Sequence, residues 1–325
     1  FVAKRVAEDP NGVMLAGKEN GAYRTISNAE AWDMAAKLCG GLLSLGIKND
    51  VLEPEHQEKI ALISPNRPEW LITDLGVQQT GAVLTPLYPT ISPHDLVYVL
   101  NEAEVRIIFI ANADMYERFK DAFAQVPTLQ HIYSFDEIPG VKNWKELINK
   151  NLQPDASIVN RITEKTLATI IYTSGTTGNP KGVMLSHENI VRNVLDCECE
   201  FWFAVRGGKA LSFLPLNHIF EKMVSYIYIN AAVSIYYAES MDTIGENLKE
   251  VQPIVFTTVP RLLEKVYEKI LAKGMELKGI KRALFFWALD LGFKYDNAKP
   301  GSLWYRIQLA IANALVFKKW REALG

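Results

Sequence analysis

Apolar residues along this chain follow two different periods, and the two periods alternate. Uninterrupted apolar runs such as Lys59–Ile63 predict buried strands, whereas apolar residues spaced three or four apart, as in 69–79, predict helices. Further strands are predicted at 82–87, 105–110, 131–135, Leu167–Thr173, 183–185, 209–214, 233–237 and 254–259. This alternation is typical of an α/β fold in which helices cover both faces of a mainly parallel sheet.

The predicted helices carry recognisable start and stop signals. Ser92 followed by Pro93 is the expected order of a cap and a first helical residue, so a helix is predicted over 92–103. Further helices are predicted at 115–124, at Ile219–Asn230 and from Pro260 onward. The residues from Ile280 on are predicted to form two long helices separated by the sequence "NAKPGS".

The length of 325 residues suggests two or three packed units of ordinary domain size. We therefore expect two doubly wound, mainly parallel sheet subdomains. One covers residues 59–205, and the other combines 1–58 with 208–325.

Composition excludes several classes of protein. With 35 basic and 37 acidic residues the net charge is -2, so no excess of positive charge indicates nucleic acid as a partner. Cys39, Cys197 and Cys199 lack the spacing of a zinc site or a disulfide framework, and they fit a reducing cytoplasm. The apolar stretch 223–238 contains three polar residues and is shorter than the roughly 20 residues of a membrane-spanning helix.

One polar loop follows directly after an apolar strand. The sequence "TSGTTGNPKG" begins at Thr173 and ends at Gly182, and it combines flexible glycines with four hydroxyl side chains and Lys181. Backbone N–H groups, hydroxyls and one ammonium can converge there on an anion. The position at the carboxyl end of a strand is where open α/β sheets bind ligands, so the loop predicts a polyphosphate site.

Two other interpretations of this loop fit its residues less well. A flexible linker rarely ends in a Lys-Gly pair that enters a new strand. The P-loop of nucleoside triphosphatases requires G-x-x-x-x-G-K-[ST], but Pro180 and Gly182 break that pattern here. The loop therefore belongs to another class of phosphate-binding motif.

The longer sequence "YTSGTTGNPKGVMLSH" resembles the phosphate-binding signature of the adenylate-forming, or AMP-binding, superfamily. The segment "GVQQTGAVLTPLYPTIS" agrees with this. "LPLNHIFEK" and "TTVPRLLEKVYEKI" are similar to segments of long-chain fatty acyl-CoA synthetases. The resemblance covers essentially the whole chain. It implies the large N-terminal domain of an enzyme that joins a fatty acid to AMP, releases pyrophosphate and transfers the acyl group to coenzyme A.

The resemblance also implies the cofactors and the phosphate site. ATP, Mg²⁺ and coenzyme A would take part in the reaction, together with a fatty acid. Lys181 would be catalytic, and the hydroxyl of Thr173 is a candidate Mg²⁺ ligand. The β- and γ-phosphates would be held by Thr173, Ser174, Gly175, Thr176, Thr177, Gly178 and Lys181.

A second group of residues is implied for the acyl substrate. His218 would be catalytic and would orient the carboxylate, unless it is simply a first-turn residue of a helix capped by Asn217. Val259, Pro260 and Arg261 would border the acyl pocket, although the helix that follows them has the spacing of a core stripe. Glu221 suits the dipole of its helix and receives no catalytic role. Lys222 stands where the family usually has arginine, so a two-pronged contact is in doubt.

Several alternatives stay open. The adenylate could be formed from another carboxylic acid, the acceptor could be a carrier-protein thiol, or the chain could be a non-catalytic nucleotide-binding module. The resemblance implies that residues 1–325 are an incomplete N-terminal adenylation domain without the C-terminal lid domain, so we expect this piece alone to be inactive.

The apolar segments "ALFFWALDLGF" and "WYRIQLAIANALVF" allow two interpretations. A helix that dips into a bilayer surface would give access to a fatty substrate. A buried helical hairpin explains the same residues. The expected location is the cytoplasm, with peripheral contact at the inner membrane surface under the first interpretation.

Overall fold

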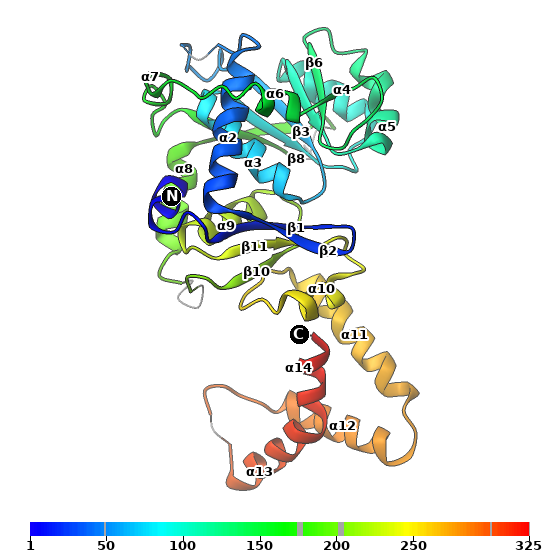
Figure 1. The fold of residues 1–325 in the computed structure, drawn as a ribbon. Coiled ribbons are helices and arrows are strands. Elements are labelled where there is room, and N and C mark those ends of the chain that lie inside the picture. The colour runs from blue at the N-terminus through cyan, green and yellow to red at the C-terminus, as the bar shows by residue number, and fades with distance from the viewer. Residues whose placement is uncertain (49, 174–177, 201–204, 300, 325) are drawn as a thin grey trace.

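Two sheets organise the protein (Figure 1). The structure is a computed structural model that describes residues 1–48, 50–173, 178–200, 205–299 and 301–324. The larger sheet has seven strands in the order β7-β6-β5-β3-β4-β8-β9, and all neighbouring pairs are parallel except β8 and β9. Its strands are β3 (Lys59–Ile63), β4 (Val83–Leu87), β5 (Ile107–Ile110), β6 (His131–Ser134), β7 (Lys142–Asn143), β8 (Leu167–Thr173) and β9 (Lys181–Ser186).

The smaller sheet joins the beginning of the chain to its later part. Its order is β10-β11-β1-β2, and the hairpin β1–β2 is its antiparallel end. Its strands are β1 (Val13–Glu19), β2 (Ala22–Ser27), β10 (Lys209–Ser212) and β11 (Ser234–Tyr237). The two sheets account for the expected α/β class with mainly parallel strands. The proposed division into subdomains stays a prediction.

Helices occupy the connections between the strands. Ser92 caps its helix as predicted, because its hydroxyl accepts a hydrogen bond from the backbone N–H of Asp95 at 3.0 Å. The helices up to β11 are α1 (Val2–Glu8), α2 (Asn28–Leu43), α3 (Pro68–Thr80), α4 (Pro93–Glu102), α5 (Ala113–Phe123), α6 (Lys145–Asn149), α7 (Ala156–Val159), α8 (His187–Cys197) and α9 (Ile219–Asn230). Those that follow are α10 (Ile244–Val251), α11 (Pro260–Glu276), α12 (Gly279–Phe293), α13 (Leu303–Ala312), the π-helix η1 (Asn313–Phe317) and α14 (Lys318–Leu324).

The two-residue period of the strands produces a separate core on each face of the larger sheet. In β3, Ile60 and Leu62 join the core that contains α2 and α3, whereas Ala61 and Ile63 join the core that contains α4 and α5. The first core continues through α9 to the smaller sheet. A third cluster packs α10 on the other face of the smaller sheet. Both sheets are therefore covered on both sides, as the sequence pattern predicts.

The prediction of a strand at 254–259 is wrong. This segment makes only an isolated bridge, between Val255 and Ala210 of β10. Pro253 lacks a backbone N–H and Pro260 fixes the start of α11, so few residues remain that could extend a ladder. The segment forms a partly exposed connection beside β10, in which Ile254 is 47% and Val259 41% exposed.

The last helices form an arm, defined here as residues 260–324, that projects away from both sheets (Figure 1). As predicted, "NAKPGS" separates two helical segments, α12 and the continuous run of α13, η1 and α14. These segments bury a small cluster of their own around Phe285, Leu291 and Val316. Large apolar residues on their other sides are exposed, so the arm is only partly a buried hairpin.

A buried ion pair joins the two sheets through their helices. Lys222 of α9 lies 2.5 Å from the carboxylate of Asp74 in α3, and both side chains are fully buried. Tyr226 also donates to Asp74, and Gln78 donates to Tyr226 at 2.5 Å. Burial lowers the pKa of Lys222, and the charge of Asp74 partly offsets this effect. The ammonium also lies 5.2 Å from the ring centre of Trp70.

We expect Lys222→Met to destabilise the protein strongly, because it leaves the carboxylate of Asp74 buried without its cation. The expected loss in unfolding free energy is about 3–5 kcal/mol, read as a lower midpoint in urea. The double variant Asp74→Asn/Lys222→Met removes both charges and keeps an acceptor for Tyr226, so it should recover most of the loss. A double variant as unstable as the single one would contradict this account.

Candidate functional site

The strand directions place one edge of the larger sheet at the centre of the site. Strands β3, β4, β5, β6 and β8 all run parallel, so their carboxyl ends meet at the same edge. The predicted phosphate loop follows β8 at this edge. Ligands of open α/β sheets bind outside the carboxyl ends of the strands, so this edge is the candidate site.

The register between β8 and β9 brings two of the predicted residues together. Thr173, the last residue of β8, pairs with Lys181, the first residue of β9, and both are exposed. Gly178 has a positive φ of 102°, a conformation that disfavours other residues. Ser174, Gly175, Thr176 and Thr177 lie outside the described residues. The phosphate-binding roles of the whole group stay predictions.

Packing beneath the loop holds the two strand ends in place. Tyr172 is buried one residue before Thr173, and its hydroxyl donates to Glu102 of α4. Gly182 pairs with Tyr172 across the ladder, and a Cβ at Gly182 would come within 2.8 Å of Ile170 Cγ2. Glycine therefore follows Lys181 for a steric reason: without a Cβ, this position lets β9 approach the side chains of Ile170 and Tyr172.

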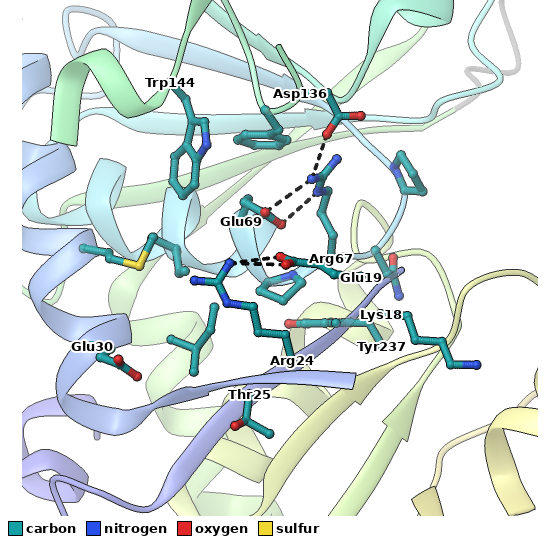
Figure 2. Close-up of a pocket in the computed structure, with 18 of the residues that line it drawn as sticks. Lys18, Glu19, Arg24, Thr25, Glu30, Arg67, Glu69, Asp136, Trp144 and Tyr237 are labelled. Atoms are coloured by element: carbon teal, nitrogen blue, oxygen red, sulfur yellow. Dashed lines mark hydrogen bonds and ion pairs between the residues drawn. The ribbon is translucent and has the colours of Figure 1, made fainter. Parts of the chain in front are cut away.

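A cleft of about 1090 Å³ opens at the same edge, between the two sheets (Figure 2). The loops after β3, β6 and β11 line it, together with the hairpin β1–β2. Figure 2 shows Arg67 bound to Glu69 at 2.8 Å and to Asp136 at 3.0 Å. Sequence reasoning missed this cleft, because its lining comes from four segments far apart in the chain.

The charge of the cleft disfavours a bare polyphosphate. Carboxylates outnumber cations along its lining. The acidic residues are Glu19, Glu30, Asp33, Glu69, Asp136, Glu137 and Glu239, and the basic ones are Lys18, Arg24, Arg67 and Lys145. An anionic nucleotide would be repelled there unless a cation accompanied it. The loop between β8 and β9 thus stays the predicted position for phosphates.

The described residues offer little to hold a magnesium ion by themselves. They contain no group of three His, Cys, Asp or Glu side chains that could bind a metal. Thr173, which is exposed, stays the one predicted ligand. Mg²⁺ is commonly held by substrate phosphates with one or two protein oxygens, and that arrangement is compatible with this site.

Asn66 fixes the loop that leads to His218. It belongs to the turn sequence "SPNRP" after β3, and its side chain donates to the carbonyl of Leu214 at 2.7 Å. The same amide accepts from the backbone N–H of Leu216 at 3.0 Å. Because Asn66 comes from the larger sheet and the loop follows β10 of the smaller sheet, this pair of bonds aligns the two halves of the site.

His218 itself caps α9, which corrects the alternative that Asn217 is the cap. Its Nδ1 accepts a hydrogen bond from the backbone N–H of Phe220 at 3.2 Å, and the side chain is exposed. A ring nitrogen that accepts carries no proton, so the neutral ring carries its proton on Nε2. The imidazole can then donate one hydrogen bond outward without adding a fixed charge. Asn217 is instead buried.

Glu221 lies in the first turn of α9, as predicted. Its side chain is buried: it is 1% exposed, and it accepts hydrogen bonds from Ser212 at 2.6 Å and Thr257 at 3.1 Å. Burial raises the pKa of Glu221 to about 7, although both hydroxyls oppose this shift. The carboxyl group joins β10, α9 and the connection to α11.

The remaining predicted residues lie close in sequence to this junction. Val259 precedes α11, Pro260 is its first residue and Arg261 its second, and all three are exposed. Thr257 links their segment to α9. The side chain of Lys222 points to Asp74 in the core. The lysine that stands here in place of an arginine therefore affects the packing of the core and not the site. The acyl-pocket role of Val259, Pro260 and Arg261 stays a prediction.

Comparison with known proteins gives a family match over most of the chain. The AMP-binding enzyme profile matches residues 2–292. A long-chain-fatty-acid–CoA ligase of Xenopus laevis is 31% identical over 96% of this chain and 44% of its own length. Long chain acyl-CoA synthetase 4 of Arabidopsis thaliana is 28% identical over 98% of this chain and 50% of its own. The chain thus spans about half the length of these relatives.

Solved structures show the same fold. The adenylation domain of a carboxylate reductase from Mycobacterium chelonae has a TM-score of 0.71 and 18% identity, over 100% of this chain and 51% of that one. A fatty acyl CoA synthetase of Mycobacterium tuberculosis has a TM-score of 0.65 and 18% identity, over 81% of this chain and 49% of that one.

The buried carboxyl of Glu221 predicts a pH dependence of stability. Its folded pKa of about 7 lies above the ordinary value of 4.5, so the folded state binds the proton more tightly. The contribution of Glu221 to stability should therefore fall as pH rises from about 4.5 to about 7 and change no further above that. The shift corresponds to about 3 kcal/mol at most.

Glu221→Gln should remove this dependence, because the amide can still bond both hydroxyls but cannot ionise. Urea unfolding midpoints at several pH values would measure it. The exposed residue Glu246 supplies the control Glu246→Gln, which should keep the wild-type profile. A Glu221→Gln profile parallel to that of the wild type would contradict the assignment.

Proposed function

The chain belongs to the family of AMP-binding enzymes, and we propose that it forms the nucleotide-binding part of a long-chain-fatty-acid–CoA ligase. The reaction joins a fatty acid to AMP, releases pyrophosphate and then transfers the acyl group to the thiol of coenzyme A. The observation that carries the proposal is the pairing of Thr173 with Lys181 at the carboxyl end of β8. The similarity to long-chain ligases over nearly the whole chain supports the choice of substrate.

The chemical difficulty of the first step is electrostatic. A carboxylate must approach the α-phosphate of a nucleotide, and both carry negative charge. The ammonium of Lys181 can neutralise part of the phosphate charge and stabilise pyrophosphate as it leaves. The hydroxyl of Thr173, next to it in the ladder, can donate a hydrogen bond to the same group.

His218 is proposed to act on the other reactant. Its Nε2–H can donate to the substrate carboxylate and orient it without adding charge to the ring. The bonds from Asn66 and Glu221 hold the segments on either side of His218. When bound, Mg²⁺ would neutralise phosphate charge, with Thr173 as one candidate ligand.

Two alternatives use the same residues. The acid or the acceptor could differ, because the adenylation domain of a carboxylate reductase has the same fold. A panel of carboxylic acids in an ATP–pyrophosphate exchange assay separates these cases. A non-catalytic nucleotide-binding module would bind ATP and give no exchange with any acid.

We also propose that the ligase acts at a membrane surface, because long-chain fatty acids partition into bilayers. Within the described residues, no helix has both the length and the apolar character needed to span a membrane. We propose that the contact is peripheral.

We expect Lys181→Ala to lower ATP–pyrophosphate exchange with a long-chain fatty acid by about 10²–10³-fold, the usual cost of removing one stabiliser of transition-state charge. The measurement uses the gene product that carries this chain. Stability should be unchanged, because the Lys181 side chain is exposed. Lys165→Ala, on an exposed turn before β8, is the matched control and should keep full exchange. Exchange by Lys181→Ala at the wild-type rate would refute the assignment.

A further inference from the structure

Both ends of the side-chain amide of Asn66 are bonded to β10 and the loop after it. The nitrogen donates to the carbonyl of Leu214 at 2.7 Å and to the hydroxyl of Ser212 at 3.2 Å. The oxygen accepts from the backbone N–H of Leu216 at 3.0 Å. A reversed amide would set two donors against each other at Leu216 and two acceptors at Leu214, so only one orientation fits.

These bonds reach the chain directly before His218. The backbone N–H of His218 donates to the carbonyl of Pro215 at 3.0 Å, which closes a turn, and the ring of His218 then caps α9. Leu214 and Leu216, the two residues whose backbone Asn66 holds, lie on either side of Pro215. The position of Asn66 is thus transmitted to His218 through a single turn of backbone.

The segment that carries Asn66 is itself held firmly. Pro65 precedes it with a restrained φ, and Pro68 is the first residue of α3. Arg67, between Asn66 and this helix, is bound to Glu69 at 2.8 Å. The amide of Asn66 therefore extends from a rigid end of the larger sheet.

Apolar packing alone does not supply the same alignment. The side chains of Leu214 and Leu216 are buried, so the loop would stay against the core without Asn66. The hydrophobic effect is non-directional, however, whereas a hydrogen bond weakens steeply when its angle departs from a straight one. Loss of the amide should therefore leave the loop packed but less precisely oriented.

The same amide begins a longer chain of hydrogen bonds. The nitrogen of Asn66 can only donate, so the buried hydroxyl of Ser212 accepts there and gives its single proton to Glu221 at 2.6 Å. The other carboxyl oxygen of Glu221 accepts from Thr257 at 3.1 Å. The chain has one direction, and it connects the larger sheet to α9 and to the segment before α11.

We propose that Asn66 is a positioning residue for formation of the acyl-adenylate and that it acts through His218. This inference rests on the proposed function, in which Nε2 of His218 donates to the substrate carboxylate. A misplacement of about 1 Å can lower a rate about 10²-fold, so an amide that fixes the turn can control the rate without touching the substrate. The predicted phosphate site should not depend on Asn66, because β4 separates β3 from β8.

The test is the kinetics of ATP–pyrophosphate exchange by the gene product that carries this chain. Asn66→Ala should lower kcat with a long-chain fatty acid by about tenfold to a hundredfold, because the carboxylate is bound but poorly oriented. The KM for ATP should change by less than about twofold, since Thr173 and Lys181 keep their positions. Asn66→Asp keeps the size of the side chain and its acceptor but loses both donated bonds, so it should be impaired in the same way.

A cycle of single and double variants shows whether Asn66 acts through His218. In a His218→Ala background, Asn66→Ala should lower exchange by less than about a further twofold, because the group that it positions is gone. A merely structural role would lower exchange by the same factor in both backgrounds. Urea unfolding midpoints check that each variant is folded, and Asn66→Asp replaces Asn66→Ala in the cycle if the alanine variant does not fold.

Asn101→Ala is the matched control. Asn101 is a partly buried asparagine of α4 whose amide also donates to two backbone carbonyls, those of Val97 and Gln125. It belongs to neither the turn nor the chain of bonds, so this variant should keep wild-type exchange.

Two results would overturn the inference while the proposed function stands. One is wild-type kcat in both Asn66 variants, and the other is an equal loss in the presence and absence of His218. Wild-type exchange by His218→Ala would remove the proposed role of that residue and the inference with it. No exchange by the wild-type protein with any carboxylic acid would refute the proposed function itself, and this inference would fall too.

Discussion

The antiparallel pairing of β9 on β8 is the constraint on which the proposed site depends. Every other neighbouring pair in the larger sheet is parallel, so the chain reverses directly only here. The reversal places Thr173 opposite Lys181 at the sheet edge where parallel α/β folds bind ligands. Gly182 permits it, because a larger residue would meet Ile170 and Tyr172 beneath the strand. A backbone register thus determines which hydroxyl stands next to which ammonium.

Polar contacts then fix the second half of the site relative to the first. Asn66 of the larger sheet holds the loop before α9, and Lys222 of α9 binds Asp74 of α3 in a dry environment. Glu221, the neighbour of Lys222, holds β10 and the connection to α11. Adjacent residues on one helical turn therefore serve two purposes: one side chain joins the sheets, and the other joins the segments around His218. Such buried polar groups are costly to separate, so they maintain one arrangement.

Much of the fold could be predicted from the sequence because strand and helix periods are local. Strands such as β3 and β8 and the helix α9 have the predicted bounds, and Ser92 caps its helix as expected. The segment 254–259 has the composition of a strand, but it makes only an isolated bridge to β10, the edge strand of the smaller sheet. Composition reports the preference of a segment and cannot report how far it pairs with a neighbouring strand.

The site was predictable only where one contiguous motif carries it. The phosphate loop is such a motif, whereas the cleft collects residues from β1, the loop after β3 and the loop after β6. The burial of Glu221 could not be predicted from its place in a first helical turn, because it depends on tertiary contacts with Ser212 and Thr257. The isolated Asp74 within an apolar helix was the one available signal for the buried pair, since a lone charge there needs a partner.

A crystal structure of the gene product with a non-hydrolysable ATP analogue tests the central claim most directly. The account predicts β- and γ-phosphate oxygens within hydrogen-bonding distance of Lys181 Nζ and Thr173 Oγ1, at the turn between β8 and β9. Phosphates bound elsewhere, for example in the acidic cleft beside Arg67, with Lys181 left in solvent, would contradict it.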